Sequence, residues 1–209
     1  MNSPWIDISY PIVNGIPQWP GDPPIKMSPH LKIGPDCFAN VTKLEWLSHF
    51  MTHVDAPLHF IADGMAVDDL SLENWSGNAI VVEVDGDCIE ERHVPEECEG
   101  LCILFKTRNG DLWQHRVFRE DYVYVSGPAA RLLALRKAKL VGVDYLSVDQ
   151  YGNLEFPAHY AILGAGIPIL EGIDLRSIMP GAYELVAFPL KISGCDGSPV
   201  RAALRSNPV

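Results

Sequence analysis

The segment His49-Phe-Met-Thr-His53-Val-Asp55-Ala-Pro57-Leu-His59-Phe60 places three histidines and one aspartate within eleven residues, more densely than any other part of the chain. Imidazole nitrogens and carboxylate oxygens together suit zinc, manganese or iron(II). The absence of cysteine from the segment argues against the thiolate-rich sites that only stabilise a fold. We therefore interpret the segment as an open, hydrolytic metal site.

Chain geometry limits the shape of this segment. A fully extended strand would separate His49 from Asp55 by roughly 20 Å, too far to share an ion. A continuous helix is disfavoured because Pro57 lacks an amide hydrogen and its ring would clash with the carbonyl of His53. We expect an irregular loop that folds back, in which the odd-numbered ligands share one face of locally extended pieces and Val54, Leu58 and Phe60 pack in apolar surroundings.

A simpler interpretation remains open from spacing alone. The histidines could form a polar surface cluster, with Asp55 accepting a hydrogen bond from a neighbouring imidazole and Pro57 making a turn. Catalytic metal sites use this ligand set regularly, which favours the metal site.

Length and composition indicate one globular domain covering residues 1–209. The chain has 47% hydrophobic and 21% charged residues, enough apolar material for a substantial core. Its formal net charge of −11 would repel phosphate backbones and anionic membrane surfaces. We expect no nucleic-acid partner and no membrane partner.

The five cysteines, at positions 37, 88, 98, 102 and 195, are odd in number and include no Cys-x-x-Cys pair. This usage favours reduced thiols. Cys98 and Cys102 could be two zinc ligands, but no second pair lies near them. The first residues lack the basic and apolar regions of a signal peptide, and no apolar run reaches the ~18 residues of a membrane helix. A cytoplasmic protein is expected.

Short β-branched or aromatic runs predict a fold dominated by a sheet. Strands are expected at 5–9, 40–47, 79–85, 101–106, 122–125, 140–144 and 183–188, with an extended segment at 167–170. Residues 11–35 contain seven prolines and three glycines and are expected to form an ordered loop.

Two helices are expected. Ser126 and Pro128 are typical of a helix start, and the apolar pattern continues to about Ala138. Because strands flank this helix, we expect a parallel crossover packed on one face of the sheet. A second, short helix is expected from Pro157 to Leu163. The sequence thus predicts an α/β (α+β) protein with a mainly β core and a few packed helices.

The pattern His-x-x-x-His-x-Asp-x-Pro-x-His at 49–59 occurs together with Gly142-Val-Asp144, Ser147-Val-Asp149, Leu170-Glu-Gly172, Pro180-Gly181, Pro189-Leu-Lys191 and Asp196-Gly-Ser-Pro-Val-Arg201. In this combination the chain resembles the cyclase family of metal-dependent hydrolases, which includes bacterial kynurenine formamidases and isatin hydrolases. The resemblance extends from about Asp7 to Arg205 and implies a swivelling β/β/α fold.

The resemblance also implies a site with two divalent ions, usually Zn²⁺, with Mn²⁺ in related isatin hydrolases. By position, His49, His53 and Asp55 would hold the first ion, and Asp55 would bridge to a second held by His159 and Glu171. His59 would be the general acid/base, and Trp19 would contact the substrate, although packing under the proline-rich loop explains Trp19 nearly as well. A homodimer or higher homo-oligomer is implied.

One residue departs from the family pattern, because Met51 occupies a position that is usually glycine. A bulkier side chain there is expected to reshape the entrance to the metals and to change the preferred substrate. The segment 142–166 also resembles the general cyclase-type members more than dedicated kynurenine formamidases.

The expected reaction is hydrolysis of an amide bond in an aromatic N-acyl or cyclic amide, as in conversion of N-formylkynurenine to kynurenine and formate. A divalent ion lowers the pKa of water toward about 7, and a histidine with a pKa near 6.5 can move the proton. Ser147 and Ser198 lie outside any Gly-x-Ser-x-Gly elbow, and Gly164-Ala-Gly166 is too short for a dinucleotide loop. A lactone or ester hydrolase, and a binding protein that uses metal only for folding, are the alternatives.

Overall fold

The computed structural model describes residues 3–115 and 117–206. Its strands are β1 (Ile6–Asp7), β2 (Lys26–Leu31), β3 (Val41–Glu45), β4 (His53–Asp55), β5 (Ser76–Glu83), β6 (Cys88–Ile89), β7 (Cys102–Lys106), β8 (Tyr124–Val125), β9 (Leu140–Val143), β10 (Ile169–Glu171), β11 (Gly181–Val186), β12 (Gly197–Pro199) and β13 (Ala203–Ser206). The α-helices are α1 (Asn109–Leu112), α2 (Gly127–Leu135) and α3 (Pro157–Gly164). Three 3₁₀ helices are η1 (Pro57–His59), η2 (Leu72–Trp75) and η3 (Glu91–His93).

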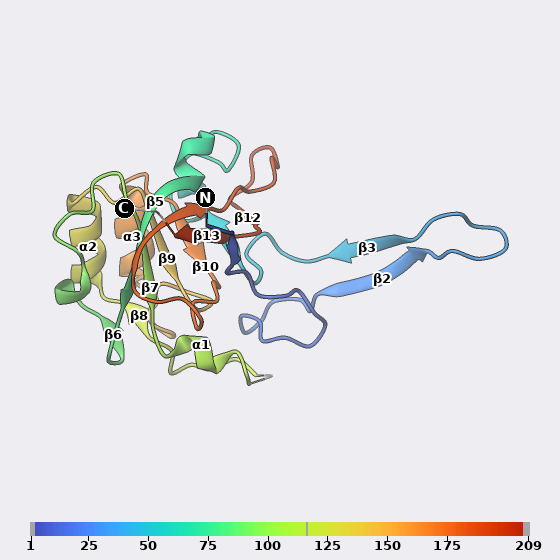
Figure 1. Ribbon diagram of the computed structural model, residues 1–209, viewed down its shortest axis with the longest axis horizontal. Helices are drawn as coiled ribbons and strands as arrows, with labels where there is room; N and C mark the ends of the chain where they lie inside the picture. The colour runs from blue at the N-terminus through green and yellow to red at the C-terminus, as the bar shows by residue number, and fades with distance from the viewer. Residues whose placement is uncertain (1–2, 116, 207–209) are drawn as a thin grey trace.

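A mixed nine-stranded sheet forms the centre of the molecule, with the strand order β1-β13-β11-β5-β7-β9-β10-β4-β12. Its middle strands β5, β7, β9 and β10 are parallel, and both flanks are antiparallel. Helices α2 and α3 lie side by side against one face (Figure 1). The expected mainly β architecture with a few packed helices is confirmed.

The parallel strands are buried on both faces, as their unbroken apolar sequences require. In β7, Ile103 and Phe105 pack in the core beneath α2 and α3, whereas Cys102 and Leu104 belong to the core on the opposite face. This alternation follows from the two-residue period of side chains in a strand. The metal-ligand candidates on β4 and β10 are therefore anchored in a sheet that is rigidly packed on both sides.

The predicted helices are present with small shifts. Helix α2 begins after Ser126, whose hydroxyl accepts a hydrogen bond from the Ala129 N–H, and it ends at Leu135, three residues before the expected end. The strand connection around α2 differs from the prediction. The strand before α2, β8, pairs with β6 in a separate two-stranded sheet, and the strand after it, β9, lies parallel to β7 in the main sheet.

Two loop predictions were wrong. Residues 26–31, inside the proline-rich segment, form β2, which pairs with β3 although Pro29 lies in the strand, because one edge of this ribbon needs no partner. Residues 53–55 form β4 instead of irregular loop, because β10 and β12 supply ladder partners on both sides. The β2–β3 hairpin extends well away from the rest of the chain (Figure 1).

No helix among the described residues has the length and hydropathy needed to cross a bilayer.

Candidate metal centre

The register of three strands places the central ligand candidates. His53 and Asp55 are two residues apart in β4, so their side chains point to the same face. Glu171 of β10 is the direct cross-strand partner of His53, which brings a third candidate to that face. Gly197 of β12 lies opposite Asp55, and a Cβ there would stand 2.5 Å from Cε1 of His49. The ring of His49 therefore needs glycine at this position.

His59 and His159 reach the site from two helical turns. Pro57 starts η1, which ends at His59 and turns this side chain back toward β4. His159 lies in the first turn of α3, where the carboxylate of Asp149 accepts hydrogen bonds from the backbone N–H groups of Ala158 and His159. Asp149 thus satisfies two of the unpaired N–H groups at the start of α3 and fixes the position of His159 in its first turn.

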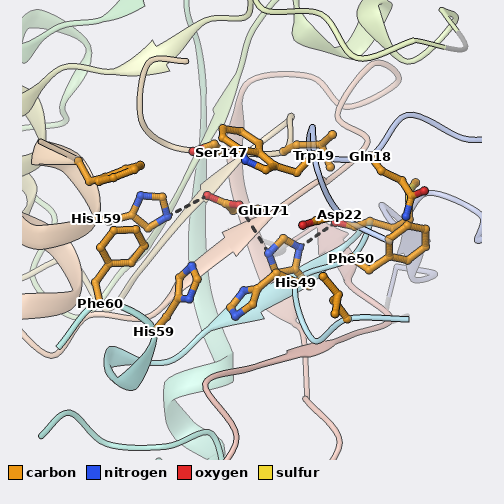
Figure 2. A pocket seen from close by; sticks show the side chains of 15 residues that line it. Gln18, Trp19, Asp22, His49, Phe50, His59, Phe60, Ser147, His159 and Glu171 are labelled. Atoms are coloured by element: carbon orange, nitrogen blue, oxygen red, sulfur yellow. Dashed lines mark hydrogen bonds and ion pairs between the residues drawn. The ribbon is translucent and has the colours of Figure 1, made fainter. Parts of the chain in front are cut away.

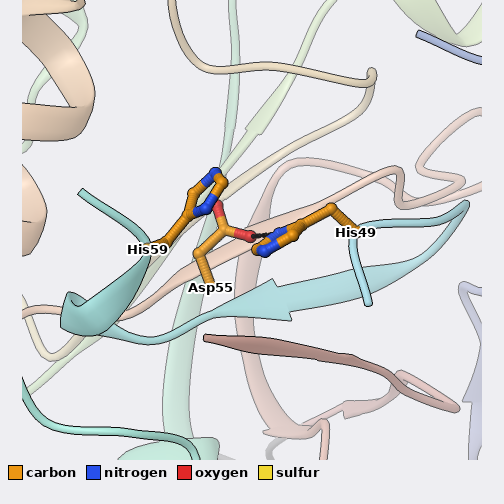
Figure 3. A group of neighbouring side chains, drawn as sticks. All are labelled: His49, Asp55 and His59. Atoms are coloured by element: carbon orange, nitrogen blue, oxygen red, sulfur yellow. Dashed lines mark hydrogen bonds and ion pairs between the residues drawn. The ribbon is translucent and has the colours of Figure 1, made fainter. Parts of the chain in front are cut away.

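The carboxylate of Asp55 is the common centre of the cluster. Its Oδ1 lies 2.7 Å from Nδ1 of His49 and 3.2 Å from Nε2 of His53. Its Oδ2 lies 3.7 Å from Nε2 of His159, and that nitrogen is also 3.6 Å from Oε1 of Glu171. Figure 3 shows Asp55 between His49 and His59. The two oxygens of one carboxylate therefore face different sets of nitrogen donors.

These residues fit a bound cation. Among the described residues, Asp55 Oδ2 is buried without a hydrogen-bond partner, an arrangement that is costly unless a cation or another group completes it. Two sets of potential ligand atoms, His49-Asp55-His59 and His53-Asp55-Glu171, each lie within 4.8 Å of one another. Nitrogen and carboxylate donors of this kind suit Zn²⁺ or Mn²⁺.

The ring nitrogens of His53 and His159 that point away from Asp55 also have hydrogen-bond partners. Nδ1 of His53 lies 2.9 Å from the carbonyl oxygen of Met51, and Nδ1 of His159 lies 2.7 Å from Oδ2 of Asp149. Because a carbonyl oxygen only accepts, His53 carries its proton on Nδ1 and presents a bare Nε2 toward Asp55 and Glu171. Metal-ligating histidines characteristically have such an outer acceptor.

Without a cation, the cluster has strongly perturbed acid–base properties. Burial lowers the pKa of both His49 and His159, but neighbouring carboxylates outweigh it. Hydrogen bonds to Asp55 and Asp196 raise the pKa of His49 to about 9, and the hydrogen bond to Asp149 with the nearby charges of Glu171 and Asp55 raises the pKa of His159 to about 10. Burial lowers the pKa of His59 to about 4. Burial and the nearby Asp55 raise the pKa of Glu171. In the ion-free protein, His49 and His159 thus hold protons that a cation would displace.

The cluster lies on one side of a cavity of about 290 Å³ whose other walls are largely apolar and include the aromatic residues Trp19, Phe50, Phe60 and Phe156. Phe60 stacks on the ring of His159, with ring centres 4.3 Å apart and planes inclined by 16°. Figure 2 shows His159 facing Glu171 with Phe60 beside it. Trp19 lines the cavity and also makes edge contacts with Phe118 and Tyr151. Packing and cavity-lining therefore coexist at Trp19.

All the site residues expected from the sequence come together here: His49, His53, Asp55, His59, His159 and Glu171 form the cluster, and Trp19 lines its cavity. Sequence reasoning gave no role to Asp149 and Asp196, the outer partners of His159 and His49. Asp196 lies 147 positions from His49, so no local spacing could have connected them. Cys98 and Cys102 belong to neither ligand set in the described part of the chain.

Comparison with known proteins identifies the family. The Cyclase family model matches residues 6–150. A kynurenine formamidase of Geobacillus thermodenitrificans is 37% identical over 209 residues, which cover 98% of this chain and 99% of that protein. The chain belongs to the Cyclase family. The resemblance drawn from the histidine segment is thereby confirmed.

Solved structures of similar proteins agree with the cyclase fold. One described as a potential metal-dependent hydrolase with cyclase activity superposes with a TM-score of 0.85 at 28% identity, covering 99% of both chains. Isatin hydrolase A from Ralstonia solanacearum superposes with a TM-score of 0.82 at 24% identity, covering 98% of this chain and 92% of that one, which shows a shared fold. The chain is therefore a cyclase-family hydrolase with a candidate metal centre.

Proposed function

We propose that this cyclase-family protein hydrolyses the amide bond of an aromatic N-acyl or cyclic amide, with N-formylkynurenine as the first substrate to test. The observation that carries the proposal is the buried Asp55 Oδ2, which has no hydrogen-bond partner and lies among the histidines and Glu171 that line the cavity. Similarity to a kynurenine formamidase over nearly the whole length of both chains supports the choice of substrate. The whole chain acts as one catalytic domain in this proposal.

The proposed ligands divide between two divalent ions, Zn²⁺ or Mn²⁺. His49, His53 and Asp55 hold the first, and His159 and Glu171 hold the second, with Asp55 shared because its two oxygens face the two sets. When bound, such ions supply Lewis acidity, which polarises a carbonyl group and makes water acidic enough to react near neutral pH.

His59 moves the proton in the proposed mechanism. It lines the cavity beside the candidate metal ligands. It is half-buried, which keeps competing water away from the ring. Its imidazole takes the proton from the attacking water and returns it to the departing nitrogen as the C–N bond breaks and the new C–O bond forms. From an N-formyl arylamine the products are formate and the free arylamine.

The aromatic walls orient the substrate. Trp19, Phe50 and Phe60 line the cavity on different sides of the cluster, and each offers a flat apolar surface to an aryl ring. Such contacts hold the carbonyl carbon beside the metal ligands without taking part in proton transfer.

A homodimer is part of the proposal, supported by the β2–β3 hairpin. Every residue of its two strands except Met27 is exposed, including Leu31 at 43%, Val41 at 42% and Leu44 at 50%. A lone two-stranded hairpin is only marginally stable in water, so a second copy of this chain is the natural support. Residues 26–45 contain three lysines and two carboxylates, whereas the whole chain has a net charge of −11, which favours contact with another copy's body.

A reducing, cytoplasmic location is also proposed, supported by five cysteines that all remain free in the structure, at positions 37, 88, 98, 102 and 195.

The test is turnover of N-formylkynurenine, formanilide, isatin, a lactone and an aryl ester by purified protein before and after chelation. Amide hydrolysis that disappears with chelator and returns with Zn²⁺ or Mn²⁺ is expected. His59→Ala should lower kcat by roughly 10² to 10⁴. His115→Ala, which changes an exposed histidine, is the matched control and should match the wild type. Metal binding without amide turnover, or ester turnover alone, would overturn the amidase assignment.

A further inference from the structure

We propose that Asp196 is a positioning residue that fixes the ring orientations of both His49 and His59. Asp196 lies immediately before β12, with Oδ2 2.8 Å from Nε2 of His49 and 3.6 Å from Nδ1 of His59. One carboxylate oxygen thus faces a proposed metal ligand and the proposed proton carrier. The part of this inference that concerns His59 rests on the proposed function, whereas the part that concerns His49 requires only a bound ion.

The contact with His49 sets which of its nitrogens is free for an ion. Nδ1 of His49 points inward to Asp55, and Nε2 points outward to Asp196. A carboxylate accepts a hydrogen bond, so it holds the imidazole proton on Nε2 and leaves the Nδ1 lone pair directed into the cluster. Asp149 does the same for His159, and the Met51 carbonyl does it for His53. Asp196 therefore completes the set of outer acceptors for the three histidine ligands.

Asp196 differs from the other two acceptors because it serves a second ring. The rings of His49 and His59 are stacked, with centres 3.8 Å apart and planes inclined by 25°. The negative charge of Asp196 attracts a proton on Nδ1 of His59, which leaves Nε2 of that ring to exchange protons with the substrate. Loss of the carboxylate would release both rings together.

The carboxylate is itself held in place. Its Oδ1 accepts a hydrogen bond from the hydroxyl of Ser48 at 3.1 Å, and its backbone carbonyl accepts one from the Ala56 N–H at 2.9 Å. Ser48 immediately precedes the histidine segment, and Ala56 lies within it, directly after Asp55. The orientation of Asp196 is thus coupled to the chain segment whose ligands it positions.

A purely structural role would be to anchor the loop before β12, and the chain offers a control for it. Oδ1 of Asp68 accepts a hydrogen bond from the Gly194 N–H at 2.8 Å, which fastens the same loop two residues earlier without touching a histidine of the cluster. Asp68→Ala removes this hydrogen bond, which loosens the loop, and leaves the contacts of Asp196 with the histidine rings in place. Differences between variants at Asp196 and at Asp68 therefore isolate the effect on the rings.

The first experiment measures Zn²⁺ affinity by competition with a chromophoric chelator, together with the visible spectrum of Co²⁺-loaded protein. Asp196→Ala and Asp196→Asn should weaken Zn²⁺ binding about 10- to 100-fold and change the Co²⁺ spectrum. Ser48→Ala should weaken binding less, and Asp68→Ala should match the wild type in both measurements. Wild-type affinity and spectrum in both Asp196 variants, or equal losses in Asp68→Ala, would overturn the proposal for His49.

The second experiment compares kcat and KM at saturating Zn²⁺, where weaker metal binding no longer limits activity. Asp196→Ala should lower kcat at least 10-fold with little change in KM, because a misoriented His59 affects proton transfer and not substrate binding. A kcat equal to that of Asp68→Ala would overturn the proposal for His59. Should the wild type hydrolyse no amide, the proposed function fails by itself, and the Zn²⁺ and Co²⁺ measurements still decide the role of Asp196 toward His49.

Discussion

Glu171 and His53 are direct cross-strand partners between β10 and β4, so sheet register alone brings together two ligand candidates that are 118 positions apart. Their side chains share one face with Asp55, and Nε2 of His53 lies 3.5 Å from Oε2 of Glu171. A shift of one residue in this register would turn Glu171 to the opposite face of the sheet. Burial of β4 and β10 on both sides thus fixes the geometry of the metal centre.

The first prediction concerns Gly197, which makes room for the ring of His49. A Cβ at this position would stand 2.5 Å from His49 Cε1 and 2.8 Å from the Val54 carbonyl oxygen, so the ring must move. Gly197→Ala should weaken Zn²⁺ binding by about 10-fold or more, measured by chelator competition. The control is Gly34→Ala, because a Cβ at Gly34 meets nothing closer than 3.9 Å. Unchanged affinity in Gly197→Ala would show that His49 is not a ligand.

The second prediction is that metal binding releases protons. Nearby carboxylates raise the pKa of His49 to about 9 and of His159 to about 10 against burial, so both rings are protonated at pH 7 in the ion-free protein. A ligand nitrogen must lose its proton, and affinity for Zn²⁺ should therefore rise as pH increases toward 9–10. Calorimetric titration in buffers of different ionisation enthalpy should show two or more protons released at pH 7, because the raised pKa of Glu171 makes it a further proton source. Release of none would contradict the assignment of both residues.

The same pKa values predict the stability of the ion-free protein. A histidine whose pKa is raised on folding stabilises the folded state fully below its unfolded value of 6.5, and this contribution is lost as pH rises through the folded pKa. The melting temperature of chelated protein should therefore fall between pH 7 and pH 10 by more than that of Zn²⁺-loaded protein. Parallel pH dependence of the two forms would argue that His49 and His159 are not the groups involved.

Much of this fold follows from local sequence, and the exceptions have physical causes. Runs such as Leu101–Lys106 are apolar on both faces and short, so they predict buried strands directly. β4 escaped prediction because three residues form a strand only when β10 and β12 pair with them, and those partners are distant in sequence. Asp196 escaped for the same reason, since its role depends on a contact with His49 across the fold.

The fourth prediction concerns Met51, which is fully buried at a positive φ of 57° and lines the cavity. A non-glycine residue in this conformation costs of order 1–3 kcal/mol, and the side chain reduces the space available to substrate. Met51→Gly should raise kcat/KM for ring-substituted formanilides about 10-fold relative to formanilide itself. Met51→Leu keeps the bulk and should retain the wild-type ratio. An unchanged ratio in Met51→Gly would mean that Met51 does not limit substrate size.

The fifth prediction separates the role of Asp149 from that of Asp196. Asp149 is buried and accepts hydrogen bonds from two backbone N–H groups of α3 as well as from His159, which an asparagine cannot do because its amide nitrogen only donates. Asp149→Asn should lower the free energy of unfolding by about 1–3 kcal/mol, measured with urea on chelated protein. Asp196→Asn, at a site with 41% of its side chain exposed, should stay near the wild-type value. Equal stability of the two variants would contradict the capping role of Asp149.

The last prediction concerns the β2–β3 hairpin and the proposed homodimer. Val41 and Leu44 are exposed at 42% and 50% on β3, which leads directly toward Leu47 at the edge of the cavity. If a second copy covers the hairpin, Val41→Ser with Leu44→Ser removes apolar contact from both copies of the interface. This double variant should convert a dimer to a monomer, as measured by light scattering after size-exclusion chromatography.

The matched control is Leu135→Ser with Leu154→Ser, which changes two exposed apolar residues outside the hairpin. They are 78% and 83% exposed and lie at the end of α2 and in the loop before α3, so this variant should remain dimeric. Because β3 continues into the histidine segment, the monomer should also show a higher KM for amide substrate. A wild-type protein that is monomeric at micromolar concentration, or a double variant that stays dimeric, would rule out the hairpin as the dimer contact.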